Sequence, residues 1–480
     1  GDLHTDRAAI IDATKPIHIV AQPLILRYQG LDSSGDPATE PINITCIPES
    51  SLQDLPSNSL NQRAVIFFRT VSPYFDGAYS EGLELGLYDT LTLGDYLVYQ
   101  DKNGLWHDVD NSGTGVGGSI MPLIEASNGD IIIGGNFTNA GGVAEADYLC
   151  KWTGTAIESV TGAADFSSIV HALCYDASDN LYIGGSFLNA GDADGDGIVK
   201  WDGTNLSSLG TGVNGVENVY AIAIDPITGD IYVGGDFTGM GGVADTAKIA
   251  YWDISATVWK PLSTGFNGSV HALAFAPNGN LYIGGAFTNA DGVNGDYICY
   301  WDGSAFNMLG DIELNEQIHD IKFDSSGNLY AVGAFTDAGG DENADYVAIF
   351  INNHWITLGS GLNDTAYRIA IHNNEIYISG LFDAIQDTIN LTDGLVIFRN
   401  GAWGKIDINL AGTSIIRFMI FDKKENFYVG GAFNGTTIAC DQKTITNNGN
   451  TKVYPTIEIL GPGVLQSITN YTTGKSIMFD

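Results

Sequence analysis

The stretch Leu281–Phe287 reads LYIGGAF, and the Gly-Gly-x-Phe at its end decides the fold. Near copies of this motif recur along the chain, each at the end of an apolar run such as IIIGGNF, IYVGGDF or FYVGGAF. Their phenylalanines are spaced by 50, 50, 50, 48, 47 and 51 residues, and they are Phe137, Phe187, Phe237, Phe287, Phe335, Phe382 and Phe433. Self-similarity at this period indicates copies of one supersecondary unit that stack on their neighbours.

Each copy contains four short runs of β-forming residues. In Ser269–Gly310 they are VHALAFA, LYIGGAF, YICYWDG and FNMLG, with an Asn-Gly turn after the first run and a longer polar loop after the second. Four antiparallel strands in about 50 residues are typical of a kelch-like β-propeller blade. A parallel β-helix is the structural alternative, but its rungs are much shorter than this repeat. The sequence therefore predicts an all-β chain that contains a β-propeller.

The two ends of the repeat region are predicted to share one blade. Asp95–Val109 reads as a third and fourth strand without a first pair, and Ala411–Phe433 reads as a first and second strand. Pairing these segments closes the ring and removes exposed strand edges. We therefore predict a seven-bladed propeller over residues 91–436. The β-like flanks, residues 1–90 and 437–480, are predicted to form one smaller domain into which the propeller is inserted.

The recurring glycines and aromatic residues have predicted structural roles. The glycine pair after the second strand indicates a β-bulge or a close approach of the next blade. The motif phenylalanines, and a second aromatic residue later in each copy, are predicted to pack between blades. The later residues are Trp152, Trp201, Trp252, Trp301, Phe350 and Phe398. Cys150 and Cys299 occupy a position that carries Val or Ala in other copies, so we expect them in the core.

Two short segments in the flanks carry a family resemblance. The first is RAVIFFRTVSPYFDGAYSEG, and the second is ILGPGVLQSITNYTTGKSIMFD. The residues that carry it are Arg63, Phe67, Phe68, Pro73, Tyr74, Gly461, Pro462, Gly463, Asn470, Thr472, Thr473, Gly474 and Lys475. Together they resemble the β-sandwich tail domain of siphophage distal tail proteins, in which kelch-like propellers with this repeat are sometimes inserted. In that family the second half continues with further strands beyond the position of Asp480.

The resemblance implies a structural, non-enzymatic component of a phage tail or tail-like particle, located in the virion tail at the distal end or baseplate. Its implied partners are copies of itself in a ring, other tail proteins, and a glycan or protein on the host surface. The loops after the second strands would face the host; they are Thr138–Asp147, Asn189–Gly197, Thr288–Asp296, Thr336–Asp345 and Asp383–Asp393. A secreted or cell-surface bacterial propeller adhesin and a propeller polysaccharide hydrolase or lyase remain alternatives.

Composition disfavours several partner classes. The chain has 20 Lys and Arg against 57 Asp and Glu, a formal net charge of −37. Such a surface repels phosphate backbones and anionic lipid, so we expect no nucleic-acid partner. No run of 18 apolar residues occurs, so we expect no membrane insertion, and residues 1–10 lack the pattern of a signal peptide.

One position on each innermost strand is a candidate binding residue. Counting back from the second strand of each copy gives Met121, His171, Tyr220, His271, His319, Tyr367 and Arg417. These residues would form a polar and aromatic ring around the central channel, able to hold a sugar or an anion. The alternative is that they pack between blades, with their polar tips bonded to the backbone. The histidines lie on different blades and lack the spacing of a zinc site.

The loop GDADGDG is a candidate calcium site. Asp192, Asp194 and Asp196 have the alternate spacing of carboxylates that a Ca²⁺ loop requires, but the glutamate expected at its twelfth position is absent. A solvated acidic loop is the alternative. No nucleophile elbow, HExxH, P-loop or dinucleotide fingerprint occurs, so we predict no catalytic residues, no enzyme activity and no other cofactor.

Overall fold

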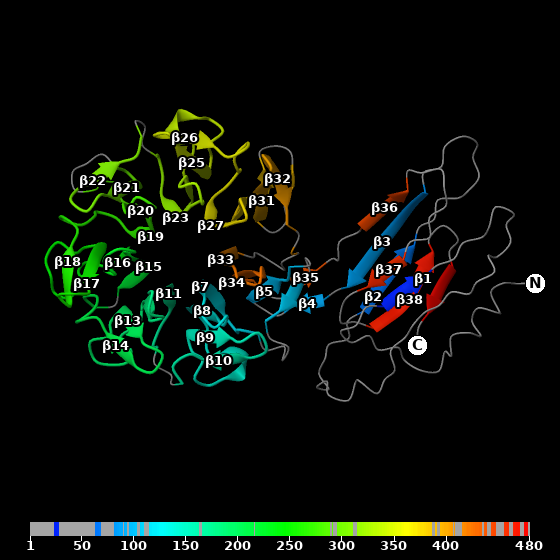
Figure 1. The fold of residues 1–480 in the computed structure, drawn as a ribbon, viewed down its shortest axis with the longest axis horizontal. Helices are drawn as coiled ribbons and strands as arrows, with labels where there is room; N and C mark the ends of the chain where they lie inside the picture. The colour runs from blue at the N-terminus through cyan, green and yellow to red at the C-terminus, as the bar shows by residue number, and fades with distance from the viewer. Residues whose placement is uncertain are drawn as a thin grey trace, which may run out of the picture. The chain divides into compact units, whose positions relative to one another are not determined.

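The computed structural model describes residues 96–433 apart from gaps at 103–105, 110–114, 163–165, 216, 289, 291–294, 311–313, 386–388, 391–393, 407 and 409–414, together with strands in the flanks. The chain divides into two compact units. One comprises residues 93–436, and the other comprises residues 1–92 and 437–480. The first unit is a ring of seven four-stranded antiparallel sheets, which confirms the predicted seven-bladed propeller (Figure 1).

The blades follow the chain order, with the first strand of each nearest the centre of the ring (Figure 1). Blade 1 contains β7 (Ser119–Glu125), β8 (Ile131–Asn136), β9 (Leu149–Trp152) and β10 (Ile157–Ser159); blade 2 contains β11 (Val170–Tyr175), β12 (Leu181–Gly185), β13 (Ile198–Trp201) and β14 (Leu206–Ser208). Blade 3 contains β15 (Asn218–Ile224), β16 (Ile231–Asp236), β17 (Ile249–Asp253) and β18 (Val258–Pro261); blade 4 contains β19 (Val270–Phe275), β20 (Leu281–Gly285), β21 (Ile298–Trp301) and β22 (Phe306–Met308).

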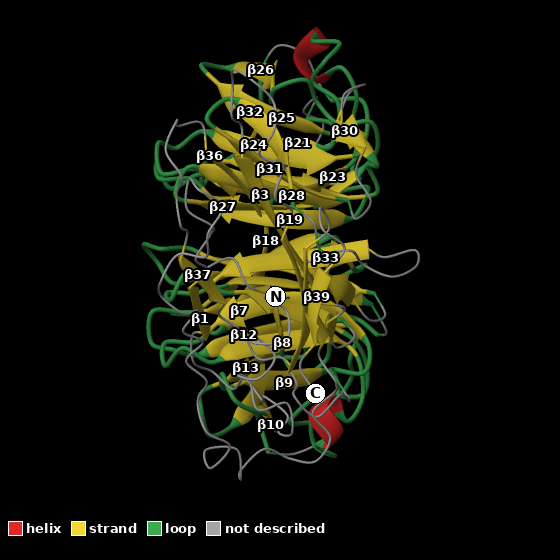
Figure 2. Cartoon of the chain, turned by 90° about the vertical axis from the view of Figure 1, so that its right-hand side faces the viewer, coloured by secondary structure: helices red, strands yellow, loops and turns green. Residues whose placement is uncertain are grey.

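Blade 5 contains β23 (Ile318–Phe323), β24 (Leu329–Gly333), β25 (Val347–Ile351) and β26 (His354–Thr357); blade 6 contains β27 (Ala366–His372), β28 (Glu375–Gly380), β31 (Leu395–Arg399) and β32 (Ala402–Lys405). A small hairpin, β29 (Ala384–Ile385) with β30 (Ile389–Asn390), lies in the long loop of blade 6. Two short 3₁₀ turns, η2 (Ala140–Gly142) and η3 (Ala338–Gly340), lie in the corresponding loops of blades 1 and 5, and strands form most of the remainder (Figure 2).

Blade 7 closes the ring with strands from both ends of the repeat region. Its order is β33 (Ile415–Phe421), β34 (Phe427–Ala432), β5 (Leu97–Gln100) and β6 (Trp106–Asp108). The register pairs Phe427 with Gln100 and Gly430 with Leu97. The composite blade predicted from the sequence is therefore confirmed.

The described strands of the flanks pair with one another. A five-stranded sheet has the order β36 (Lys443–Asn447), β3 (Glu81–Asp89), β2 (Arg63–Phe68), β38 (Val464–Asn470) and β39 (Lys475–Met478). Two further pairs are β1 (Leu24–Arg27) with β37 (Thr456–Ile459), and β4 (Leu91–Leu93) with β35 (Thr436–Ile438). The predicted β-sandwich stays a prediction. Of the residues that carry the resemblance, Pro73, Tyr74, Gly461, Pro462, Gly463, Thr472, Thr473 and Gly474 lie outside the described residues.

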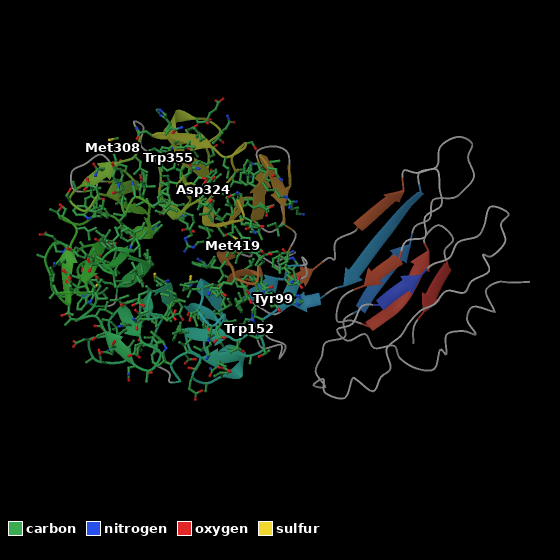
Figure 3. All side chains as sticks on the ribbon, viewed as in Figure 1. Tyr99, Trp152, Met308, Asp324, Trp355 and Met419 are labelled. Carbon is green, nitrogen blue, oxygen red and sulfur yellow. The ribbon has the colours of Figure 1, made fainter. Side chains whose placement is uncertain are left out.

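The motif phenylalanines form the core of the propeller. All seven have at most 3% of their surface exposed. The second set of aromatic residues falls into two groups: Trp152, labelled in Figure 3, is buried, while the others are partly exposed. The cluster that contains Trp152 also includes Leu97 and Tyr428 of blade 7, so it packs between blades as predicted. Cys150 and Cys299 are fully buried, which confirms them as core residues.

In each blade, one residue in the left-handed backbone conformation lies just before the third strand and is hydrogen-bonded to the Gly-Gly-x-Phe motif. It is Tyr96, Tyr148, Gly197, Lys248, Tyr297, Tyr346 or Gly394, and its φ lies between 57° and 76°. In all seven blades its carbonyl accepts the N–H of the second motif glycine, as in Gly285 to Tyr297 at 2.9 Å. In blade 7 the same bonds join the two ends of the repeat region, since Tyr96 donates to Phe433 at 3.1 Å and Gly431 donates to Tyr96 at 3.0 Å.

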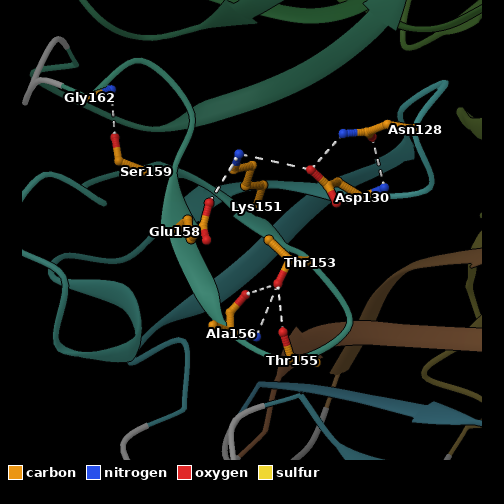
Figure 4. Close-up of polar contacts among 9 residues, drawn as sticks. All are labelled: Asn128, Asp130, Lys151, Thr153, Thr155, Ala156, Glu158, Ser159 and Gly162. Atoms are coloured by element: carbon orange, nitrogen blue, oxygen red, sulfur yellow. Dashed lines mark hydrogen bonds and ion pairs between the residues drawn. The ribbon is translucent and has the colours of Figure 1, made fainter.

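The outer strands are joined by polar contacts at the surface. In blade 1, Lys151 on β9 lies between Glu158 on β10, at 3.1 Å, and Asp130 beside β8, at 3.9 Å (Figure 4). Lys151 and Glu158 are also direct cross-strand partners in the register. Opposite charges at facing positions stabilise a sheet modestly. The outer edge of the blade is therefore polar, while the interfaces between blades are apolar.

The first motif glycine sets the distance between neighbouring blades. A Cβ on Gly284 would lie 2.6 Å from Cγ2 of Ile318, on the first strand of the next blade. Blade 5 has Val332 at this position, and the facing residue of blade 6 is Ala366, so the small and large residues are exchanged. At the interface of blades 5 and 6, the larger side chain therefore comes from the second strand of blade 5, whereas at Gly284 it comes from the first strand of the next blade.

This exchange predicts a coupled pair of substitutions. Ala366→Val should destabilise the propeller by about 1–3 kcal/mol, because it overpacks Val332. Adding Val332→Gly should recover much of that loss, because it recreates the Gly-Val arrangement of Gly134 and Val170. Urea unfolding of the wild type, both single variants and the double variant gives the coupling free energy. Strictly additive losses would contradict the predicted contact.

Candidate functional site: the axial ring

Each predicted ring residue lies at a β-bulge of an innermost strand. In blade 2, Val170 pairs with Gly185 and Ala172 pairs with Gly184, so His171 is left between two consecutive pairs. Equivalent register shifts take in Tyr220, His271, His319, Tyr367 and Arg417. In β7 the shift is wider and takes in Met121 and Pro122. The glycine pair thus sits opposite a bulge, and the bulge determines which side chain joins the ring.

Five consecutive ring residues form a continuous arc. The ring centroids are 5.2 Å apart for His171 and Tyr220, and 5.9 Å apart for Tyr220 and His271. The arc continues at 6.0 Å from His271 to His319, and at 5.1 Å from His319 to Tyr367. All seven ring residues are partly exposed. The structure therefore brings the side chains of blades 2–6 together from five separate strands.

The histidines bond to neighbouring polar groups. Nδ1 of His271 lies 3.0 Å from the carbonyl of Ile318, and Nδ1 of His319 lies 3.0 Å from the carbonyl of Ala366. A carbonyl can only accept, so Nδ1 carries the hydrogen in both. Each bond crosses to the next blade. These contacts match the packing interpretation of the ring, and they hold the imidazoles in fixed orientations.

Burial keeps the ring histidines neutral. The pKa of His171 and of His319 is lowered to about 4, chiefly by burial and also by the positive charge of Arg368. The pKa of His271 is lowered for the same two reasons, although its bond to Ile318 opposes the shift. Above pH 6.5 the three imidazoles are therefore uncharged hydrogen-bonding groups.

Arg368 joins the ring but was missed in the sequence analysis. It follows Tyr367, at the position after the bulge, where it pairs with Ser379. The residues at this position in the seven blades are Pro122, Ala172, Ala221, Ala272, Asp320, Arg368 and Phe418. An alignment of the copies one residue beyond the chosen position would have found it. Alanine therefore occupies this position only in blades 2, 3 and 4, and the other four blades depart from it.

The guanidinium of Arg368 is held between two blades. Nη1 donates to the carbonyl of His319 at 3.0 Å and to that of Tyr367 at 3.1 Å. Cζ lies 5.7 Å from the ring centre of Phe418 in blade 7, a cation–π contact. Nε is buried and has no hydrogen-bond partner, and the same is true of Nε in Arg417.

Both arginines act electrostatically on the ring histidines. Arg368 in blade 6 lowers the pKa of histidines in blades 2, 4 and 5, and Arg417 in blade 7 lowers the pKa of His171 in blade 2. A charge on the rim of one blade would be too far from the other blades to act on all of them. The two guanidinium groups also act on each other, because Arg417 lowers the pKa of Arg368.

The carboxylate of Asp320 acts electrostatically on Arg368. Its oxygens accept the N–H of Ile321 at 2.9 Å and of Ile369 at 3.2 Å, and Lys322 lies 3.5 Å away. Asp320 raises the pKa of Arg368, but burial lowers it more strongly. Among the residues that the structure describes, no carboxylate makes an ion pair with Arg368 or Arg417.

The ring lies at the end of the axis that faces the long loops. Its members are the second or third residues of their strands. Directly before these strands, side chains accept N–H groups at the start of the long loops. Asn267 binds Thr288 at 2.9 Å, and Asn315 binds Thr336 at 2.9 Å. The predicted loops over residues 288–296 and 383–393 are described only in part.

The aspartates of the candidate calcium loop bond to the backbone. Oδ1 of Asp192 accepts the N–H of Asp194 at 3.0 Å, and its Oδ2 accepts that of Ser208 at 3.2 Å. Oδ1 of Asp196 accepts the N–H of Asn189 at 2.8 Å, as Asp345 does for Asp337 in blade 5 at 2.9 Å. Across the described ranges, no group of His, Cys, Asp or Glu is arranged to hold a metal ion. The geometry thus gives these aspartates turn-forming roles.

No described helix is long and apolar enough to cross a membrane.

Comparisons with known proteins concern the fold. Residues 204–281 match the model of one family, described as the Rax2 C-terminal beta propeller domain. No curated protein matches the sequence. Among solved structures, the chain is similar to the WD40 beta propeller domain of Doa1, with 12% identity and a TM-score of 0.45, covering 72% of this chain and 97% of that one.

Two further solved structures are similar at the same level. YCF48 bound to D1 peptide has 13% identity and a TM-score of 0.43, with 77% of this chain and 98% of that chain covered. PorZ, described as a bacterial surface component of the type-IX secretion system of Porphyromonas gingivalis, has 14% identity and a TM-score of 0.41. The match covers 91% of this chain and 61% of PorZ.

Proposed function

We propose that this chain is a non-enzymatic structural component of a phage tail or tail-like particle, and that its propeller binds a glycan or protein on the host surface. The observation that carries the proposal is the pairing of β2 with β38. These strands lie in the two segments that resemble distal tail proteins, and they pair in parallel from Arg63 with Val464 to Phe68 with Asn470. Segments about 400 residues apart thus meet in one sheet, as a carrier with an inserted propeller requires.

The propeller suits a binding role. Loops on one face surround the axis, and the bonds from Asn267 and Asn315 fix where two of them begin. Binding residues are commonly found on loops that a rigid scaffold positions. The partly exposed ring at the same end adds histidine and tyrosine side chains that can bond to or stack on a sugar.

The test locates the protein and measures binding separately. Mass spectrometry of purified tail particles should find the chain in stoichiometric amounts, and electron microscopy of antibody-labelled particles should place it at the distal end. The fluorescently labelled full chain should bind intact host cells but not cells stripped of surface polysaccharide and protein. Recovery with cell envelopes and absence from particles would favour an adhesin. Release of new reducing ends from host polysaccharide would favour a hydrolase or lyase.

A further inference from the structure

We propose that Arg368 and Arg417 form an oxyanion-binding site on the propeller axis, and that the group they bind is a carboxylate of an acidic sugar on the host surface. This inference rests on the proposed function for the source of the ligand. The site itself rests on the geometry of the ring.

Arginine is concentrated at this point of the propeller. Residues 93–436 contain three arginines, Arg368, Arg399 and Arg417, in a chain with a net charge of −37. Arg399 is exposed on β31, whereas the other two lie on the adjacent innermost strands β27 and β33. Two of the three arginines in this unit are therefore on neighbouring innermost strands.

Each of the two guanidinium groups has a donor without a partner. A guanidinium carries five N–H donors, and Nη1 of Arg368 is bonded to two backbone carbonyls. Nε of Arg368 and Nε of Arg417 are buried without a partner. Buried polar groups are nearly always hydrogen-bonded, so two unpaired Nε groups on neighbouring blades indicate a missing acceptor. A carboxylate presents two acceptor oxygens in the plane that a guanidinium fork fits.

The surroundings favour an anion over a cation or a neutral sugar. The two arginines repel each other, since Arg417 lowers the pKa of Arg368, and Asp320 already accepts the N–H groups of Ile321 and Ile369. An anion between the arginines would offset this repulsion. The neutral histidines add donors and acceptors without adding charge. The rings of His319 and Tyr367 are tilted toward each other with centroids 5.1 Å apart, and Arg368 bonds to the backbone carbonyls of both residues, so these rings can contact the sugar.

The test uses the full chain and four probes. Isothermal titration and thermal unfolding are measured with galacturonate, with galactose as its neutral counterpart, with inorganic sulfate and with sodium chloride at equal ionic strength. We expect galacturonate to bind at least tenfold more tightly than galactose, about 1.4 kcal/mol. Weaker binding of sulfate that competes with galacturonate would show that the charge is recognised and the sugar adds affinity. Equal affinity for galacturonate and galactose, or no binding of either anion, would overturn the proposal.

Variants assign the binding to the arginine pair. Arg368→Gln and Arg417→Gln should each weaken galacturonate binding at least tenfold, while Arg399→Gln, the exposed control, should leave it unchanged. Circular dichroism shows whether each variant folds, and Arg417→Gln keeps the test valid if the more buried Arg368 cannot be replaced. Unchanged affinity in a folded Arg417→Gln variant would overturn the site.

The site and the proposed function can fail separately. Arginine-dependent binding of galacturonate by a protein absent from tail particles would support the site and refute the particle role. Host binding that is unchanged in both arginine variants and by removal of acidic sugars would refute the site alone.

Discussion

Gly285→Ala should strongly destabilise the propeller, lowering the free energy of unfolding by about 3 kcal/mol or more. A Cβ at this position would lie 2.1 Å from the carbonyl oxygen of Ser269 and 3.0 Å from Cα of Val270. These are backbone atoms at the start of β19, so the methyl group cannot be accommodated by turning a side chain. The bulge at His271 and the bond from Gly285 to Tyr297 would both be disturbed.

Gly203→Ala is the matched control. Gly203 has φ +89°, and no atom lies within 4 Å of the added Cβ. Gly203→Ala should therefore lower the free energy of unfolding by only about 1 kcal/mol, the cost of placing alanine in a left-handed backbone conformation. Urea unfolding monitored by tryptophan fluorescence measures both variants. If Gly285→Ala were no worse than Gly203→Ala, the close approach of β19 and β20 would not be the reason for the second motif glycine.

Acid should destabilise the propeller through its ring histidines between pH 6.5 and pH 4. The pKa of His319 falls to about 4 in the folded chain because of burial, and the ordinary value is 6.5. The unfolded chain binds the proton more readily across this window, so stability is full above pH 6.5 and falls as the pH approaches 4. Each unit of pKa corresponds to about 1.4 kcal/mol, so His319 alone should account for about 3 kcal/mol.

His319→Asn isolates this contribution, because an asparagine amide can still donate to the carbonyl of Ala366 but does not titrate. The wild type should lose about 3 kcal/mol more than the variant between pH 7 and pH 4, as measured by urea unfolding at half-unit steps. His354→Asn, at an exposed position on β26, should follow the wild type. Carboxylates titrate alike in all three proteins and cancel in the comparison. Parallel curves for the wild type and His319→Asn would contradict the expected shift.

The fold was largely predictable because the same pattern, an apolar strand that ends in small residues and a buried phenylalanine, occurs seven times. One Gly-Gly-x-Phe could mark many kinds of turn, but a fixed spacing with a buried phenylalanine at each step leaves few architectures. The composite blade was predictable because Asp95–Val109 matches a half copy. What could not be predicted was the exchange at Val332 and Ala366, because it depends on which residues face each other across two blades.

The residues of the axial ring could be predicted from the sequence only in part. Its seven positions followed from counting along the repeat, and the structure places them at the bulges. Arg368 was missed because a bulge brings two consecutive residues to the axis, while the count allowed one for each blade. The carboxylates of Asp192 and Asp196 show the converse: the calcium-like spacing also suits turns that bond to their own backbone.

Blade 7 has a mechanical consequence. The chain enters the propeller at the start of β5 and leaves at the end of β34, and these antiparallel neighbours place both points at the same end of one blade. A pull on the propeller would therefore reach the rest of the chain through two adjacent segments of blade 7. Because both segments leave from the same end, they share the load instead of being pulled past each other. We therefore expect the backbone hydrogen bonds between Tyr96, Phe433 and Gly431 to keep the ring closed under tension.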